Sequence, residues 1–310
     1  MTIAILYAES RFTPWSENID TDTVVRAFKA LRTSHSVSLV HMTEPNAELC
    51  DLLRTYDAVL NLCNGYRSHA QCDIAMWLDE AGIPQIANSG ASQVIAQDKR
   101  RTESLLHDCG LPVVRSVTSP DIHVLSAHVI AKPRCGGCHR NIDVVPTERI
   151  SEHWERWVRM DYLVQPYLTG REFSVAVLPA SRGRGFEALE PVEIVPVPRR
   201  DVFIAGQSMG RTVREFHPEL HASERRILKE TAIRAHEMVG FTYSSRVDFR
   251  MWNGQVFILD VNAMPNMHPT LSLFPSLLRE HGIRLSDFYK RLVRTHVRLR
   301  TAPPVSRLAM

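Results

Sequence analysis

The sequence contains few lysines, few cysteines and no long apolar run, and each shortage excludes a class of protein. Only five of its 37 Lys and Arg residues are lysine. No apolar run approaches the about 20 residues that span a bilayer. The first residues, MTIAILY, lack the basic segment and cleavage site of a signal peptide. Six cysteines in 310 residues are too few for a disulfide-dense secreted fold. The net charge of +3 requires no nucleic-acid partner. We expect a cytoplasmic protein that binds neither membrane nor nucleic acid.

The composition is that of an ordinary globular protein, with 44% hydrophobic and 23% charged residues. The length suits two or three subdomains around one cleft. The excess of arginine is compatible with anionic ligands, although codon bias is the favoured explanation. Changes of pattern along the chain predict three regions: 1–88, 89–168 and 169–310.

The first region alternates between predicted strands and helices. The strands are Thr2–Leu6, Ser36–His41 and Ala58–Leu62, and the helices are Thr21–Arg32, Ala47–Thr55 and Ile74–Ala81. Such alternation predicts an open parallel sheet of the α/β class. Ligands of these sheets bind beyond the carboxyl ends of the strands, which places Ala8–Asn18 and Cys63–Ser68 at a cleft.

The other two regions predict an α+β fold with antiparallel strands. In the second region we expect a helix at Lys99–Cys109 and strands at Val113–Val117, Val129–Lys132 and Ile142–Val145. In the third we expect strands at Glu172–Leu178, Ala188–Val197, Ser245–Met251 and Val256–Val261. A helix should span Ser223–Val239, with Ser223 as its N-cap and Gly240 after it. Trp252-Asn253-Gly254 predicts a hairpin turn.

Polar side chains alternate with apolar ones along the two strands that this turn joins. Asp248 lies on the first strand, and Asp260 and Asn262 lie on the second. Because strand side chains alternate with period two, Asp260 and Asn262 face one side, and Asp248 can join them across an antiparallel pair. Arg246 has the same parity as Asp248. A solvent-facing stripe is the plain alternative, but the second strand runs into a polar loop with two prolines, which favours a site. Hard oxygen donors suit Mg²⁺.

A second motif is a Gly-rich loop after a β-rich run that ends at Lys132. Backbone N–H groups around Gly136 and Gly137 can cradle phosphates, while a lysine neutralises their charge. The same loop reads Cys135-Gly-Gly-Cys138-His139, the pattern of c-type haem attachment. The missing signal peptide and the β-rich setting weigh against haem. A redox or zinc role for the two thiols, or no role at all, stays open.

Taken in order, these motifs resemble the ATP-grasp superfamily and, within it, D-alanine–D-alanine ligase and its relatives. The resemblance covers nearly the whole chain. The segments that carry it are 60–65, 78–84, Gln97-Asp98-Lys99, Gly110-Leu-Pro-Val, 167–173 and 246–262.

The resemblance implies an ATP-grasp fold with an N-terminal open parallel α/β domain, and it implies a nucleotide site. Lys99 and Lys132 would contact the phosphates of ATP, and Glu172 would take the ribose hydroxyls. Gln165 would face the adenine. The remaining residues of this ATP site are Gly136, Gly137, Cys138, Tyr167 and Leu168.

The resemblance also implies a reaction centre next to the nucleotide. Asp248, Asp260 and Asn262 would bind two Mg²⁺ ions, with Mn²⁺ as a substitute, and Arg246 would stabilise the tetrahedral intermediate. The remaining residues would meet the amino acids: Glu17 the amino group of the first, Ser272 the carboxylate of the second, and a backbone N–H near Asn266 the oxyanion.

The chain departs from this family where the amino acids would sit. It has Gly137-Cys138-His139 in place of a Gly-Ser-Ser loop, and Asn64-Gly65 in place of a His-Gly pair. Gln165 replaces a carboxylate, Asn266 replaces a glycine, and one extra residue precedes Ser272. The lid around 202–213 contains Arg211 but no lysine. These changes predict substrates other than D-alanine.

The resemblance thus predicts an ATP-dependent carboxylate–amine ligase that forms an amide or dipeptide through an acyl-phosphate. Its partners would be a small-molecule carboxylate and amine, most simply amino acids, and a homodimer stays open. The alternatives are an ATP-grasp ligase of specialised metabolism, a non-catalytic nucleotide-binding module, and a thiol-based protein centred on Cys135 and Cys138.

Overall fold

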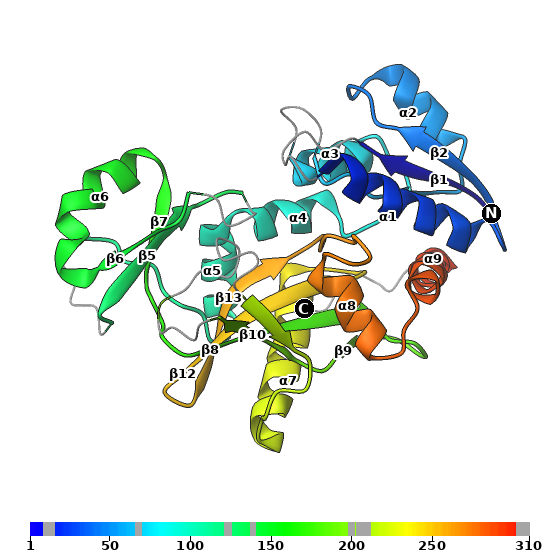
Figure 1. Cartoon of the computed structure of the whole chain (residues 1–310). Coiled ribbons are helices and arrows are strands. Elements are labelled where there is room, and N and C mark those ends of the chain that lie inside the picture. Colours follow the sequence, from blue (N-terminus) through cyan, green and yellow to red (C-terminus); the bar gives the residue numbers. More distant parts are fainter. Residues whose placement is uncertain are drawn as a thin grey trace.

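The described part of the chain forms three separate sheets, as Figure 1 shows for the computed structural model. The structure describes residues 1–8, 16–65, 70–120, 126–136, 141–197, 202 and 212–301, without the side chains of residues 16–20. Within these ranges, none of the helices combines the length and apolar character that crossing a bilayer requires.

The N-terminal sheet is parallel throughout, which confirms the α/β prediction for this region. Its strands run in the order β2-β1-β3-β4. The bounds are β1 Thr2–Tyr7, β2 Ser36–His41, β3 Ala58–Asn61 and β4 Gln85–Ile86. The helices that alternate with them are α1 Ser16–Leu31, α2 Ala47–Arg54 and α3 Gln71–Glu80. The carboxyl ends of β1 and β3 therefore lie at one edge of the sheet. Most of the two segments expected at a cleft there, Ala8–Asn18 and Cys63–Ser68, lie outside the described residues.

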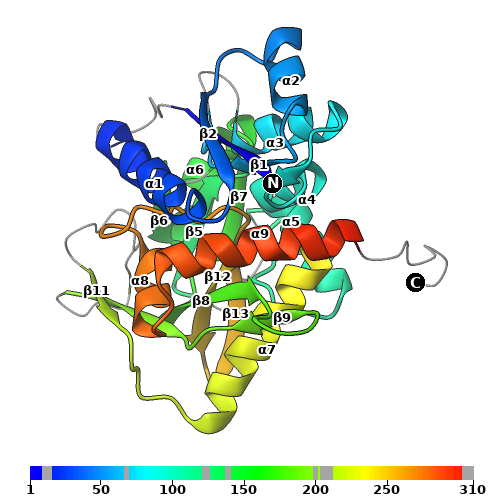
Figure 2. The same ribbon diagram turned by 90° about the vertical axis from the view of Figure 1, so that its right-hand side faces the viewer.

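Two hydrophobic cores cover the two faces of this sheet. Leu6 and Val59 pack with residues of α2 and α3 on one face. Ile3, Ile5 and Leu60 pack on the other face with α1 and with helices from the end of the chain, α8 (Leu273–Glu280) and α9 (Leu285–Thr301). α9 lies against α1, as two views show (Figures 1 and 2). The central strands β1 and β3 are thus buried on both sides, which explains their near-continuous apolar residues.

The middle sheet is antiparallel, in the order β6-β5-β7, and forms a small lobe with α6. Its elements are β5 His128–Pro133, β6 Asp143–Pro146, β7 Tyr162–Pro166, the short 3₁₀ helix η1 Thr147–Arg149 and α6 Ile150–Arg159. The fully buried Trp157 of α6 packs against Val129 and Ala131 of β5. Helices α4 (Gly90–Gln97) and α5 (Lys99–Asp108) precede the lobe.

The strand expected at Val113–Val117 is absent from the described structure, which corrects that prediction. Val113 makes a single bridge to Ile258, and the Val117 N–H donates to the Val164 carbonyl at 2.7 Å. The two ends of the run meet different sheets, because Val113 lies beside the edge strand β13 and Val117 beside β7. The run forms no strand because no neighbouring segment pairs with it over more than one residue.

The third sheet has the order β11-β10-β8-β12-β13, and β9 pairs with the far end of β8. The bounds are β8 Arg171–Pro179, β9 Phe186–Ala188, β10 Val192–Pro196, β11 Thr212–Glu215, β12 Ser245–Trp252 and β13 Gln255–Asn262. Phe173, Val175 and Val247 face α7 (Ala222–Val239). The opposite face carries the polar residues of β8, β12 and β13.

Two boundaries in this region differ from the predictions. The strand expected at Ala188–Val197 is divided into β9 and β10, because the chain leaves β8 at Leu189 and returns to pair with it at Val192. The N-cap of α7 is His221 and not Ser223, which lies in the first turn. The expected Gly240 ends this helix with a φ of 82°.

The β12–β13 hairpin turns as predicted and contains an irregularity that was not predicted. Asn253 and Gly254 have φ values of 49° and 74°, as a two-residue turn of type I′ requires. The register then shifts between Asp248 and Phe249, so that Leu259 has no opposite residue. This is a β-bulge, and it directs the carbonyl of Leu259 out of the ladder.

Candidate active site

The polar residues of β12 and β13 share one face of the third sheet. Arg246 pairs with Asn262 and Asp248 with Asp260, so the four side chains form two adjacent cross-strand pairs. The expected shared face is therefore confirmed, and it depends on the bulge at Leu259, without which Asp248 would lie opposite Leu259. On the other side of β12, Ser174 of β8 lies opposite Asp248.

Arg246 and Asp248 form a bidentate ion pair on this face. Arg246 Nε and Nη2 lie 2.9 and 2.8 Å from the two carboxylate oxygens, and the Ser174 hydroxyl donates to Oδ1 of Asp248. The two side chains are 18% and 14% exposed. Burial disfavours the Arg246 charge, but Asp248, Asp260 and Glu172 outweigh it and raise the pKa of Arg246. The Arg246 guanidinium therefore stays charged although its side chain is largely buried.

A second ion pair lies at the other end of the same face. Glu172 of β8 sits opposite Arg250 of β12, with 2.7 Å between Glu172 Oε2 and Arg250 Nη2. Arg250 also stacks on the ring of Tyr167, 5.3 Å from its centroid. Burial raises the pKa of Glu172 to about 7, although Arg250 opposes the rise. Sequence reasoning missed Arg250 and Ser174, although both have the parity of the residues that it selected.

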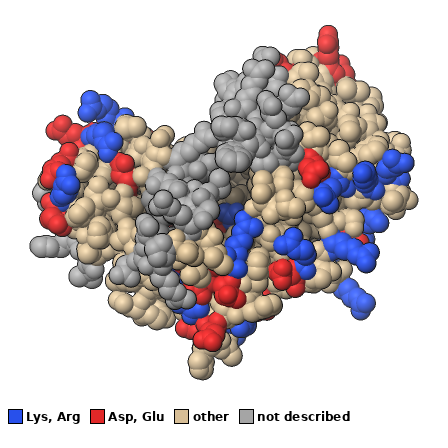
Figure 3. Space-filling view, in the orientation of Figure 1, with Lys and Arg blue, Asp and Glu red and all other residues tan. Residues whose placement is uncertain are grey.

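A narrow cavity lies between the third sheet, α5 and the lobe, and it collects several of the predicted ATP-site residues. In the space-filling view a hollow sets the lobe apart from the rest of this face (Figure 3). The predicted residues that line the cavity are Lys99, Lys132, Gln165 and Asp260. The other lining residues are Thr102, Glu103, Leu106, Val113, Val114, Ile258 and Leu259.

The two lysines reach this cavity from different elements. Lys132 is the penultimate residue of β5, and its amine donates to the Leu259 carbonyl at 3.3 Å, the group that the bulge exposes. Lys99 begins α5, and its amine donates to the carbonyl of Gly136 at 2.6 Å. Burial lowers the pKa of Lys132 to about 8, despite the attraction of Asp260. An anion in the cavity would stabilise the charged form.

The amide of Gln165 has a fixed orientation. Its NH₂ group donates to the Val114 carbonyl at 2.7 Å and to Glu103 Oε2 at 3.1 Å. Both partners are acceptors, so the amide oxygen is the group left for another donor. The backbone N–H of Tyr167 donates to the His128 carbonyl at 2.8 Å. Any backbone N–H offered to a base here must therefore come from Leu168 or beyond.

A braced loop joins β13 to α8 and carries two more predicted residues. The Ser272 hydroxyl donates to Asn266 Oδ1 at 2.6 Å, and this oxygen also accepts the His268 N–H. Arg214 of β11 donates to the carbonyls of Leu271 and Ser272. The loop is thus fastened to the strand that follows the expected lid, a contact that sequence reasoning missed.

Three predicted residues lie outside what the structure describes: the side chain of Glu17, and Gly137 and Cys138. Most of the expected lid, with Arg211, lies outside it too. Cys135 is exposed, while His139 falls in the same undescribed stretch as Cys138.

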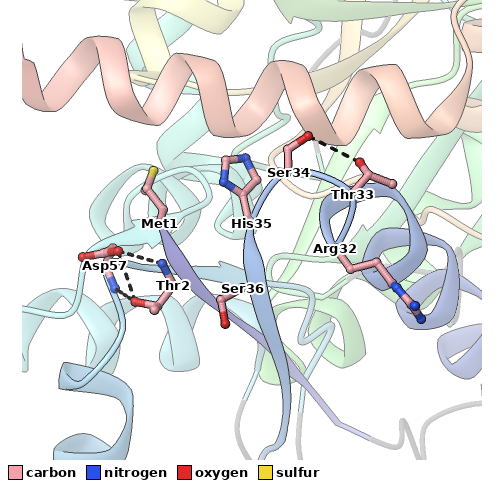
Figure 4. A pocket seen from close by; sticks show the side chains of 8 residues that line it. All are labelled: Met1, Thr2, Arg32, Thr33, Ser34, His35, Ser36 and Asp57. Atoms are coloured by element: carbon pink, nitrogen blue, oxygen red, sulfur yellow. Dashed lines mark hydrogen bonds between the residues drawn. The ribbon is translucent and has the colours of Figure 1, made fainter.

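A separate hollow lies at the opposite edge of the N-terminal sheet, at the amino ends of its strands. Its lining consists of Met1, Thr2, residues 32–36 and Asp57, and Asp57 accepts hydrogen bonds from Thr2 (Figure 4). Burial and the neighbouring terminal amine lower the pKa of His35. None of the predicted site residues lies in it.

Known proteins match most of this chain in sequence and in structure. Residues 124–294 match the family model described as the D-ala D-ala ligase C-terminus. The D-alanine–D-alanine ligase of Gluconobacter oxydans is 30% identical over 252 residues, which cover 77% of this chain and 80% of that protein. The ligase of Thermotoga petrophila is 27% identical over 280 residues, 87% of this chain and 90% of that protein. The Bacillus anthracis D-alanine–D-alanine ligase complexed with ATP superposes with a TM-score of 0.73 at 16% identity, covering 98% and 100% of the two chains.

The fold and these matches define an ATP-binding ligase of the ATP-grasp class, which confirms the predicted fold. Within that class, the chain belongs to the D-alanine–D-alanine ligase family. It is accordingly an ATP-dependent enzyme that forms C–N bonds.

Proposed function

We propose that this ligase phosphorylates the carboxylate of one amino acid with ATP and joins it to the amine of a second. The observation that carries the proposal is the shared face of Arg246, Asp248, Asp260 and Asn262 beside a cavity that two lysines enter. The relatives named above are D-alanine–D-alanine ligases. We propose a dipeptide or amide product here and infer substrates other than D-alanine, because the departures at 64–65 and 266–272 fall where the resemblance places the amino acids.

The donor set of the shared face fits a hard cation. Asp260 and Asn262 present a carboxylate and an amide oxygen on one strand, and Asp248 lies opposite Asp260. Among the described residues no group of three His, Cys, Asp or Glu side chains could hold a metal, and the proposed site adds the Asn262 amide to two carboxylates. When bound, Mg²⁺ would supply neutralisation of the phosphate charge.

The protein's own residues would neutralise the phosphate charge, stabilise the oxyanion and hold the substrates. The Lys99 and Lys132 ammonium groups lie at the cavity where phosphates would sit, and they offset the negative charge of the transferring group. Arg246 is charged and held rigid by Asp248, so it can stabilise an oxyanion without reorganising. The paired Ser272 and Asn266 would hold the substrates at the rim. No side chain in the described part is an evident base for the amine, and a substrate group would serve.

The three regions 1–88, 89–168 and 169–310 are proposed as the units between which the substrates bind. In support, each region contains one of the sheets. The middle lobe would cover the nucleotide, and the carboxyl edge of the parallel sheet would meet the amino acids.

The test is a screen for ADP release over pairs of D- and L-amino acids, followed by mass spectrometry of the products. An amide product and ADP in equal amounts are expected for at least one pair. The Asp260→Asn variant should form no ADP, because it weakens the proposed cation site; the exposed Glu152→Gln serves as its control. Full turnover by Asp260→Asn would refute the metal assignment. ADP release without preference for any amine would favour a different reaction.

A further inference from the structure

Arg134 occupies the root of the Gly-rich loop, directly after β5. Its Nε and Nη2 atoms lie 2.9 and 2.6 Å from the two oxygens of Asp98, a bidentate pair. Asp98 is only 6% exposed and is the N-cap of α5, where it also accepts the N–H groups of Arg100 and Arg101. The Asp98 carboxylate thus fixes both the start of α5 and the first residues of the Gly-rich loop.

The same arginine ties a third segment to this point. Its backbone N–H donates to the Asp161 carbonyl at 3.0 Å, and its Nη1 lies 3.4 Å from the Asp161 carboxylate, in the turn between α6 and β7. Its own carbonyl accepts the N–H of Lys99 at 3.0 Å. A bridge between Asp98 and Cys135 continues the contact by one residue.

Arg134 and Asp98 each stabilise the charged form of the other. Burial disfavours the Asp98 carboxylate, but Arg134 and the N–H groups of α5 outweigh it and lower the pKa of Asp98. The hydrogen bond and charge of Asp98 raise the pKa of Arg134. The pair therefore stays ionised across the physiological range.

Each member of the pair is next to a group that faces the phosphate region. Lys99 follows Asp98 in the chain, and Gly136 lies two residues beyond Arg134. The Lys99 amine reaches the Gly136 carbonyl at 2.6 Å, which closes the ring of contacts. Loss of the ion pair would release the lysine and the root of the loop together.

We propose that Arg134 is a positioning residue that holds Lys99 and the start of the Gly-rich loop in place to receive the phosphates of the nucleotide. The inference rests on the proposed function for the role of Lys99 and of the loop. Arg134 itself acts on the nucleotide only through these neighbours.

The test compares binding of ADP and of adenosine, which lacks phosphates, by calorimetry on the full chain. The variants are Arg134→Ala, Arg134→Lys, and the double variant Asp98→Asn with Arg134→Gln, which keeps the helix cap and restores a neutral hydrogen bond. The control is Arg149→Ala, which breaks an exposed ion pair of the same lobe, 2.7 Å from Glu152.

Arg134→Ala should weaken ADP binding at least about tenfold, which is the loss of one charge-assisted contact, and leave adenosine binding within about twofold. The double variant should recover part of the loss, Arg134→Lys should fall between, and Arg149→Ala should change neither ligand. Equal losses for ADP and adenosine, or a lower melting temperature with unchanged ADP binding, would overturn the proposal. If Arg134→Ala does not fold, the lysine and double variants give the same comparison. If the wild type binds ADP but joins no pair of substrates, the proposed function is refuted. The comparison of ADP with adenosine still tests the role of Arg134.

Discussion

The lowered pKa of Lys132 makes nucleotide binding depend on pH in a direction that the structure fixes. Burial brings this pKa to about 8 in the free protein. Its amine is therefore charged below pH 8 and neutral above it. If phosphates bind only the charged form, the apparent Kd for ADP should rise about tenfold between pH 7 and pH 9, one unit above the pKa. The phosphates themselves add little, because their second pKa lies near 6.

The assay is calorimetric titration of ADP at constant magnesium from pH 6.5 to 9.5, with wild type and Lys132→Arg side by side. Arginine keeps its charge throughout, so the variant should give a flat profile above pH 7, whatever its affinity. A flat wild-type profile would show that Lys132 remains charged or does not meet the phosphates. An equal slope in both proteins would assign the pH dependence to another group. Either result would refute the role derived from the contact with Leu259.

Further predictions concern the pH dependence of stability, the choice of nucleotide, and the backbone. Burial lowers the pKa of His236 to about 3, so the folded protein holds a neutral ring while the unfolded chain takes up a proton below about pH 6.5. The stability advantage over His236→Asn should therefore shrink by about 2 kcal/mol between pH 8 and pH 5, measured by urea unfolding; a constant difference would contradict this. Because Gln165 offers its amide oxygen, kcat/KM should favour ATP over ITP, which has a 6-oxo group, by roughly tenfold or more, and Glu103→Ala should reduce that ratio. No discrimination in the wild type would remove Gln165 from the base site. Gly170 has a φ of 138°, and a Cβ there would lie 2.1 Å from a carbonyl of β12. Gly170→Ala should therefore cost about 3 kcal/mol or more of unfolding free energy, and Gly185→Ala, with open space around it, clearly less.

The parts of the fold that depend on short-range periodicity could be predicted from the sequence. The common face of Arg246 and Asp248, and that of Asp260 and Asn262, is a local property of each strand. The Asn253-Gly254 turn alone would set Asp248 opposite Leu259, and the bulge at Leu259 brings it opposite Asp260. The parallel N-terminal sheet followed from the alternation of strands and helices for the same reason.

Contacts between distant segments could not be predicted, because a local pattern does not name its partner. Arg250 and Glu172 are 78 residues apart, and Arg134 and Asp98 are 36 apart. The bulge at Leu259 likewise depends on how β13 meets β12, not on the residue itself. Val113–Val117 contains three valines, which favour strands, but it meets β13 and β7 only at its two ends and forms no ladder.

The packing of α9 against α1 has a consequence for how the protein is made. Ile3 and Ile5, at the start of the chain, share one core with Phe288 and Leu292, near its end. While the chain is still on the ribosome, only α1 can cover this side of the first sheet, and the rest of it stays exposed until α8 and α9 emerge. The nascent chain must therefore shield that apolar surface for most of its synthesis, which makes it a natural client for chaperones.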